Sequence, residues 1–145
     1  MRDRSRARGW ALQMLYAWEA RGMKGSPLDA MRDFVRERNV AVESRGYIEW
    51  LLGTVAEHRE AIDRAVGEAL TNWRLERLSA IDRNILRLAA AEMLFIEEVP
   101  PRVSIQEAIV LAEKYGTAES PRFVNGVLDA LMHRADGGGG ADVKG

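Results

Sequence analysis

The segment 80–97 constrains the fold of this chain most strongly. Ser79 and Asp82 form a pattern typical of a helix start, in which the Ser79 side chain caps the first turn. The residues that follow are apolar on almost every side of the predicted helix. A helix without a polar face is stable only when other helices surround it, so 80–97 is predicted to be a central helix. Arg87 and Glu92 interrupt the apolar surface, and burying either charge unpaired is costly. We expect each to pair with another side chain or to reach the surface.

The rest of the chain is predicted to supply the surrounding helices. Apolar residues recur three and four positions apart, and Ser-Pro pairs mark two helix starts. Ser104 and Glu107 match a capping box, while Asn39 and Gly116 are expected to end helices. We find no convincing alternation of apolar and polar residues of the kind that indicates strands. The predicted helices cover about residues 9–22, 26–38, 43–69, 80–97, 104–116 and 120–133, with a short helical turn at 73–78.

These patterns predict an all-α fold of about seven helices in two packed helical bundles. The N-terminal bundle is expected at about 1–70 and the C-terminal bundle at about 71–136, sharing a core. A chain of 145 residues is of the size of one domain. Residues 137–145 begin with four consecutive glycines and are predicted to form a disordered tail.

The composition excludes several classes of protein. The chain has no cysteine, which excludes a disulfide framework, a thiolate metal site and a cysteine nucleophile. No apolar run approaches the roughly 18 residues that a membrane span requires. The basic N-terminus is not followed by the apolar stretch typical of a signal peptide. A cytoplasmic location without a membrane contact is therefore expected.

Residues suited to catalysis are scarce. The two histidines, His58 and His133, are interpreted as a solvated helix residue and a helix-terminal residue, because neither has a second ligand at a metal-binding spacing. The sequence contains no phosphate-binding glycine loop, dinucleotide fingerprint or nucleophile elbow. We therefore predict a protein that is not an enzyme and needs no metal or cofactor.

The N-terminal arm is the clearest signal of function. Residues 1–24 contain six basic and two acidic side chains, a net +4, whereas the remaining residues contain 15 and 20, a net −5. Arginines at every second position from 2 to 8 would share one side of an extended strand, or form two stripes on a helix. Either form can follow a phosphate backbone, so the arm predicts contact with a polyanion. The alternative is a flexible charged terminus without a specific partner.

Aromatic residues close to the arm extend this prediction. Trp18 is expected in the core, whereas Trp10 and Tyr16 fall off the apolar face and are candidates for stacking an unpaired base. For Trp10, partial burial against a neighbouring helix is the alternative. Gly126 stands inside a predicted helix, where it costs about 0.5–1 kcal/mol relative to alanine. A close approach of another backbone would explain it.

Four short blocks of sequence occur in order over residues 4–134. They are RAR before ALQMLYAW (6–8 and 11–18), IDRNILRLA (81–89) with Glu92, VP before IQEA (99–100 and 105–108), and KYG before SPRFVNGVLD (114–116 and 120–129). Together these blocks resemble the NusB family.

The resemblance implies a fold of seven helices in two bundles and a role in transcription antitermination. NusB-like proteins bind the boxA element of single-stranded RNA in ribosomal RNA operons, together with NusE, a small-subunit ribosomal protein, in a complex on RNA polymerase. By position, the resemblance implies that RNA contacts Arg4, Arg6, Arg8, Arg87, Arg122 and Phe123. It implies that Tyr16, Asp82 and Glu92 lie on the side that faces NusE.

Two other functions follow from the same resemblance. A NusB-like domain also forms part of a ribosomal RNA cytosine methyltransferase, but this chain contains neither a cysteine nor a glycine-rich cofactor loop. Some NusB-like proteins self-associate, so a homodimer could cover the RNA surface. Binding of S-adenosylmethionine would favour the enzyme, and sedimentation with and without RNA would reveal the dimer.

Overall fold

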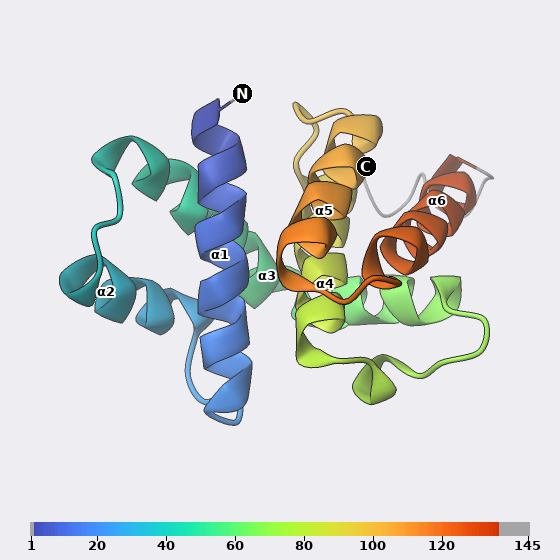
Figure 1. The fold of residues 1–145 in the computed structure, drawn as a ribbon, viewed down its shortest axis with the longest axis horizontal. Helices are drawn as coiled ribbons and strands as arrows, with labels where there is room; N and C mark the ends of the chain where they lie inside the picture. The colour runs from blue at the N-terminus through green and yellow to red at the C-terminus, as the bar shows by residue number, and fades with distance from the viewer. Residues whose placement is uncertain (1, 137–145) are drawn as a thin grey trace.

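The computed structural model describes residues 2–136 and is helical throughout that range (Figure 1). It confirms the predicted all-α class, because no strand occurs among the described residues. Among the described residues there are six α-helices, one fewer than the roughly seven predicted, and one short 3-10 helix, η1, at the predicted helical turn. The glycine-rich tail at 137–145 lies outside the described residues. The elements are α1 (Arg2–Ala20), α2 (Pro27–Glu37), α3 (Val42–Ala69), η1 (Leu75–Arg77), α4 (Ala80–Phe95), α5 (Pro101–Tyr115) and α6 (Ser120–Asp136).

The N-terminal arm is part of α1 and not a separate extended segment. The helix was expected to begin at residue 9, yet it begins at Arg2. Ala7 and Arg8 are buried, and packing of this kind extends a helix beyond the limit set by local propensity. Gly22, with a φ of 83°, lies just beyond the end of α1, so the chain turns there in a conformation that favours glycine.

Local signals placed some helix ends correctly. Ser26 accepts a hydrogen bond from the Leu28 amide, with Pro27 in the first turn, as its sequence predicted. Ser79 likewise accepts from the Asp82 amide at 3.2 Å and begins α4. The expected left-handed cap at Asn39 is wrong, because α2 ends at Glu37 and its C-cap residue, Arg38, is extended.

The capping box expected at Ser104 and Glu107 is also wrong. Helix α5 begins one turn earlier, at Pro101, so Ser104 lies inside the helix and is fully buried. A proline in the first turn starts the helix without a side-chain cap, because the amide it lacks would be unpaired there in any case. Gly116 ends this helix as expected.

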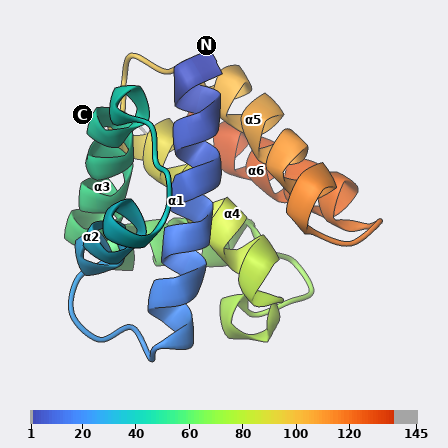
Figure 2. The same ribbon diagram turned by 60° about the vertical axis from the view of Figure 1, so that its left-hand side comes forward.

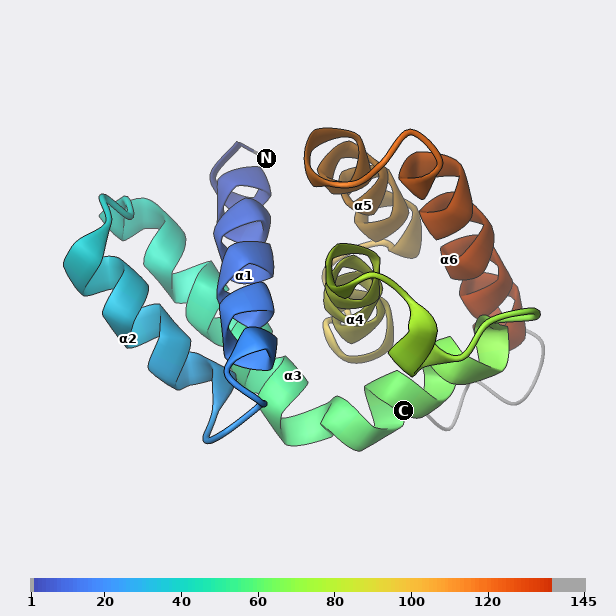
Figure 3. The same ribbon diagram turned by 60° about the horizontal axis from the view of Figure 1, so that its bottom comes forward.

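Helix α3 is long and kinked, and it connects the two halves of the molecule (Figure 3). The kink lies at His58, whose backbone is not helical (φ −117°, ψ 22°). One turn earlier, the Thr54 hydroxyl donates to the Trp50 carbonyl at 2.7 Å, a bond that often bends helices. The His58 ring stacks on Phe95 with centroids 3.9 Å apart, so it is less solvated than expected. Helix α3 packs against α1 and α2, and also against α4 and α6.

Helix α4 is the central helix that its apolar surface predicted. It packs against α1, α3, α5 and α6, and residues 84–94 are all buried. Figure 2 shows α1 with α2 and α3 on one side and α5 and α6 on the other. One apolar core runs from Ala7 to Met132, so the two expected bundles share their interior. No helix of the described part is long and apolar enough to cross a membrane.

Gly126 lies on the exposed side of α6. A Cβ atom built on it would meet nothing within 4 Å in the described chain. The close approach that we expected at this position is therefore not made inside the protein, and the packing of this chain does not require a glycine here.

Candidate nucleic-acid interface

The helical conformation of the arm divides its arginines between two faces of α1. Arg4 and Arg8 lie one turn apart and both point toward Tyr47 of α3, whose ring centroid is 4.5 Å and 5.6 Å from their guanidinium carbons. Arg4 also forms an ion pair with Glu98. Arg6 points to solvent and has no acceptor among residues 2–136. Of the predicted arm contacts, Arg6 is thus the most accessible to a phosphate.

Arg8 is the centre of a buried polar cluster. Its Nε atom donates to Glu92 at 2.7 Å, and a terminal nitrogen donates to Glu107 at 3.2 Å. Only 4% of Arg8 and 1% of Glu92 is exposed. Burial would lower the pKa of the Arg8 guanidinium, but the charge and hydrogen bond of Glu92 outweigh it and raise that pKa above its usual value.

The Glu92 carboxylate is fully satisfied by this cluster. The Tyr47 hydroxyl donates to one oxygen, and the Ser104 hydroxyl donates to the other at 2.9 Å. Burial and the bond to Glu92 raise the pKa of the Tyr47 hydroxyl above its usual value, so it stays a donor. The cluster joins α1, α3, α4 and α5 at one point.

A second ion-pair cluster joins the other end of α1 to α3 and α4. Arg87 donates to Glu19 at 2.6 Å and to Asp63 at 2.8 Å. Arg83 forms a further ion pair with Glu19. Burial would raise the pKa of the Glu19 carboxyl, but the hydrogen bonds from Arg83 and Arg87 outweigh it and lower that pKa.

Three of the predicted contact residues are therefore internal, which corrects the sequence-based set. Arg8 and Arg87 are each 4% exposed with their donors engaged, so direct RNA contact does not fit this structure. Glu92 is 1% exposed and does not reach a surface that could face NusE. Arg87 pairs with Glu19 and Asp63, and not with Glu92.

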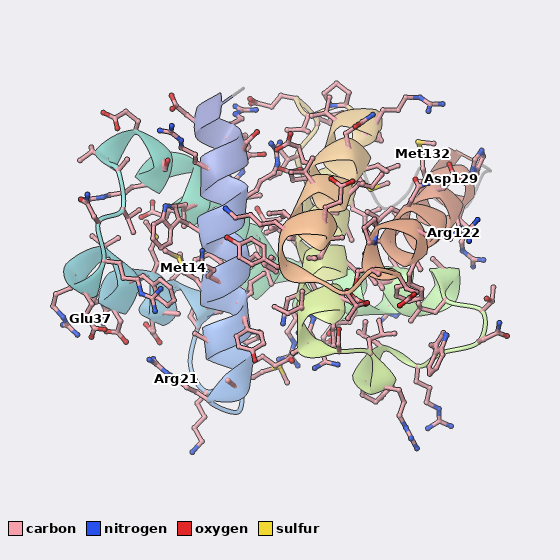
Figure 4. All side chains as sticks on the ribbon, viewed as in Figure 1. Met14, Arg21, Glu37, Arg122, Asp129 and Met132 are labelled. Carbon is pink, nitrogen blue, oxygen red and sulfur yellow. The ribbon has the colours of Figure 1, made fainter. Side chains whose placement is uncertain are left out.

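The other predicted contact residues reach the surface. Tyr16 is 45% exposed, and Trp10 is half-buried with its ring edge-on to Phe34. Arg122 is exposed at the start of α6 and has no acceptor in the described part of the chain. Figure 4 shows Arg122 on the side of the molecule away from α2. Phe123, beside it, is half-buried against the core.

A hydrogen bond connects the exposed face of α1 to the start of α6. Gln13 donates to the Tyr115 hydroxyl at 3.3 Å, and Tyr115 is the last residue of α5, five residues before α6 begins at Ser120. We name the set formed by Arg6, Gln13, Tyr115, Arg122 and Phe123 the α1–α6 surface. It offers two free guanidinium groups and partly exposed aromatic rings, which suit a phosphate backbone and unpaired bases.

The candidates for the NusE side lie at a different junction. Tyr16 is one turn from Glu19, and Asp82 is adjacent to Arg83, so the Glu19–Arg83 ion pair brings the two candidates to the same end of α1 and α4. The Asp82 Oδ1 atom is buried and accepts no hydrogen bond within the described residues. A buried carboxylate oxygen without a donor is costly, but the chain itself covers this atom, so another molecule does not reach it in this conformation.

Some structural residues of the site were not found from the sequence. Tyr47 and Ser104 complete the Glu92 cluster, and Glu107 binds Arg8, yet none stands near its partner in the sequence. Glu107 was interpreted as a helix cap, and only the start of α5 at Pro101 shows otherwise. Among the described residues, no group of three or more potential ligands could hold a metal ion.

Comparisons with known proteins agree with this helical arrangement. The model of the NusB family matches residues 5–133. The transcription antitermination protein NusB of Trichlorobacter lovleyi is 47% identical over 128 residues, which is 88% of this chain and 89% of that protein. The NusB protein of Sorangium cellulosum is 47% identical over 131 residues, covering 90% of this chain and 92% of that protein.

Solved structures of NusB proteins have the same fold. The crystal structure of T. maritima NusB matches with a TM-score of 0.81 and 33% identity over 89% of each chain. A crystal structure of the antitermination factors NusB and NusE in complex with double-stranded RNA matches with a TM-score of 0.83 and 32% identity, over 92% of this chain and 98% of that one.

Proposed function

We propose that this chain, which belongs to the NusB family, binds boxA-type single-stranded RNA together with NusE during transcription of ribosomal RNA operons. Its family makes it a transcription antitermination protein and not an enzyme, as the sequence predicted. We further propose that the chain acts in the cytoplasm as part of a complex on RNA polymerase. A structure of NusB and NusE with RNA, similar to this chain at 32% identity, supports both binding partners.

One observation carries the RNA part of the proposal: Arg6 is exposed and unpaired among residues 2–136, on a helix whose neighbouring arginines are engaged. A free guanidinium gains more from a phosphate than one that must first leave a carboxylate. Arg122 presents a second free guanidinium at the far end of the α1–α6 surface. Phe123, which follows Arg122 in the sequence and is half-buried, is proposed to stack an unpaired base.

Arg4, Arg8 and Arg87 have a supporting role in this proposal. Arg4 is partly exposed and held by Glu98, so it can exchange that exposed ion pair for a phosphate at low cost. Arg8 and Arg87 hold α1 against α3, α4 and α5, which fixes the direction in which Arg6 points. We therefore assign to Arg8 and Arg87 the role of positioning α1, without direct contact with RNA.

The NusE contact is proposed at the junction of Tyr16 and Asp82. Tyr16 supplies exposed aromatic area with a hydroxyl, and the half-buried Asp82 supplies a carboxylate in the first turn of α4. Aromatic residues of this kind often contribute most to binding at protein interfaces. Tyr16 lies one turn from Gln13 on α1, so the proposed NusE junction adjoins the α1–α6 surface.

The test measures binding of a boxA RNA and a scrambled RNA, with and without NusE. We expect tighter binding of boxA, and a further gain when NusE is present. Arg6→Ala should weaken RNA binding, whereas Arg32→Ala, which removes an exposed arginine of α2, should not. Equal binding of both RNAs with and without NusE would contradict the proposal. Sedimentation of the same samples would reveal a homodimer that covers the α1–α6 surface.

A further inference from the structure

The connection between α3 and α4 exposes a tryptophan. Trp73 is 60% exposed, compared with 45% for Tyr16 and 43% for Trp50. An indole ring of this size is costly to leave in water unless a partner covers it in the working state. The core does not need this ring, because Leu75, the first residue of η1, and Leu78, which follows η1, already anchor the connection against the core.

Two arginines flank this ring without ion pairs. Arg74 and Arg77 are exposed, and neither has an acceptor among the residues that the structure describes. They belong to the part of the chain beyond residue 24, which has 15 basic and 20 acidic residues and repels polyanions as a whole. Arg74 and Arg77, beside the exposed indole, therefore form a locally basic site on a part of the chain that is acidic as a whole.

The backbone of the connection is fixed by the second ion-pair cluster. Arg83, which is paired with Glu19, also donates to the carbonyl oxygens of Leu75 and Leu78 at 3.2 Å and 2.6 Å. The Arg77 amide donates to the Arg74 carbonyl at 2.9 Å. Because the backbone is already ordered, a ligand that binds here avoids much of the entropy cost of ordering a loop.

We propose that Trp73, Arg74 and Arg77 form a second contact for single-stranded RNA, in which the indole stacks a base and the arginines bind adjacent phosphates. We name this set the α3–α4 contact. An aromatic face beside guanidinium groups is the combination that binds unpaired nucleotides independently of their sequence. The inference rests on the proposed function, because it extends the path of the same RNA strand.

The position of this contact determines how it can be tested. Figure 1 places the connection between α3 and α4 at the lower edge of the molecule and the N-terminal end of α1 at the upper edge. A short RNA that occupies the α1–α6 surface should therefore leave the α3–α4 contact empty. A longer RNA should reach both, and the gain in affinity should depend on Trp73.

The experiment measures binding of a short boxA RNA and of the same RNA extended by single-stranded nucleotides at either end. Trp73→Ala should weaken binding of the extended RNA by about 5- to 150-fold, the range for loss of one stacked base, and leave the short RNA unaffected. Trp73→Phe should retain most of the affinity. Trp50→Ala is the matched control, because Trp50 is also exposed but lies on α3 beside Glu49.

The contribution of Arg74 and Arg77 is tested by measuring RNA affinity as a function of salt concentration. Replacing both Arg74 and Arg77 by alanine should flatten the slope of log affinity against log salt by about 1.4 for the extended RNA, since each phosphate contact contributes about 0.7. Unchanged affinity and slope for the extended RNA in both sets of variants would overturn this inference. If Arg6→Ala still weakened binding of the short RNA, the proposed function would remain supported. Failure of the wild type to bind either RNA would overturn both.

A protein ligand is a distinct outcome. If Trp73→Ala weakened binding of NusE while RNA binding stayed unchanged, the α3–α4 contact would be a protein-docking site and the RNA inference would be overturned. Thermal unfolding of each variant should match the wild type, because the side chains removed are exposed.

Discussion

Replacing Arg8 by alanine should destabilise the protein severely. The truncation would leave the Glu92 carboxylate 1% exposed and facing only the Tyr47 and Ser104 hydroxyls. Breaking a buried ion pair by removing one partner costs about 3–5 kcal/mol, whereas an exposed pair is worth about 0–1 kcal/mol. Since a typical domain is stable by about 5–15 kcal/mol, Arg8→Ala should remove a large fraction of the free energy of unfolding.

Urea unfolding followed by circular dichroism measures this loss. The midpoint should fall while the slope stays constant, because the same surface is exposed on unfolding. Replacing Arg8 by methionine and Glu92 by glutamine together should recover part of the stability, since neither charge then remains unpaired. A loss below about 1 kcal/mol in Arg8→Ala would refute the reasoning, because it would place Arg8 with the exposed arginines.

Three further predictions concern other parts of the molecule. Glu19→Gln should lower stability by an amount that is constant near neutral pH and shrinks below about pH 4, because a carboxyl with a lowered pKa stabilises the fold only while it is ionised; acid unfolding of both proteins measures this. Gly126→Ala should raise the free energy of unfolding by about 0.5–1 kcal/mol, since an added Cβ meets nothing within 4 Å; a lower thermal midpoint would contradict this. Tyr16→Ala should weaken NusE binding by about 1 kcal/mol or more in calorimetry without changing RNA binding, and equal affinity would remove Tyr16 from that interface.

The fold was predictable because its main signals are local. The apolar surface of 80–97 identified α4 as central, and Ser26 and Ser79 marked helix starts that the structure confirms. Signals that compete locally were less reliable. Ser104 and Glu107 satisfy the capping-box pattern, but their side chains are used in contacts to α4 and α1. A pattern over four residues contains no information about such distant acceptors.

The candidate site was predictable only in part, for the same reason. The alternating arginines of the arm identified a basic segment, but whether each one points inward depends on where α1 begins and what packs against it. Arg8 and Glu92 are 84 positions apart, and Arg87 and Glu19 are 68 apart. Arg87 and Glu92 each interrupt an apolar stretch, which indicated that each needed a partner. The identity of that partner required the tertiary structure.

The division of the arm into inner and outer arginines has a consequence for affinity. Under the proposed function, Arg8 would contribute to RNA binding through the position of α1, and Arg6 would contribute through its charge. Mutations of the two residues should therefore weaken RNA binding by different routes. The first should lower stability and affinity together, and the second should lower affinity alone.

The salt dependence of RNA binding by Arg6→Ala tests the central claim most directly. The account predicts weaker binding of boxA RNA, a slope of log affinity against log salt that is flatter by about 0.7, and an unfolding midpoint equal to that of the wild type. An unchanged slope with unchanged affinity would contradict the account, because it would show that the free guanidinium of α1 does not contact the RNA backbone.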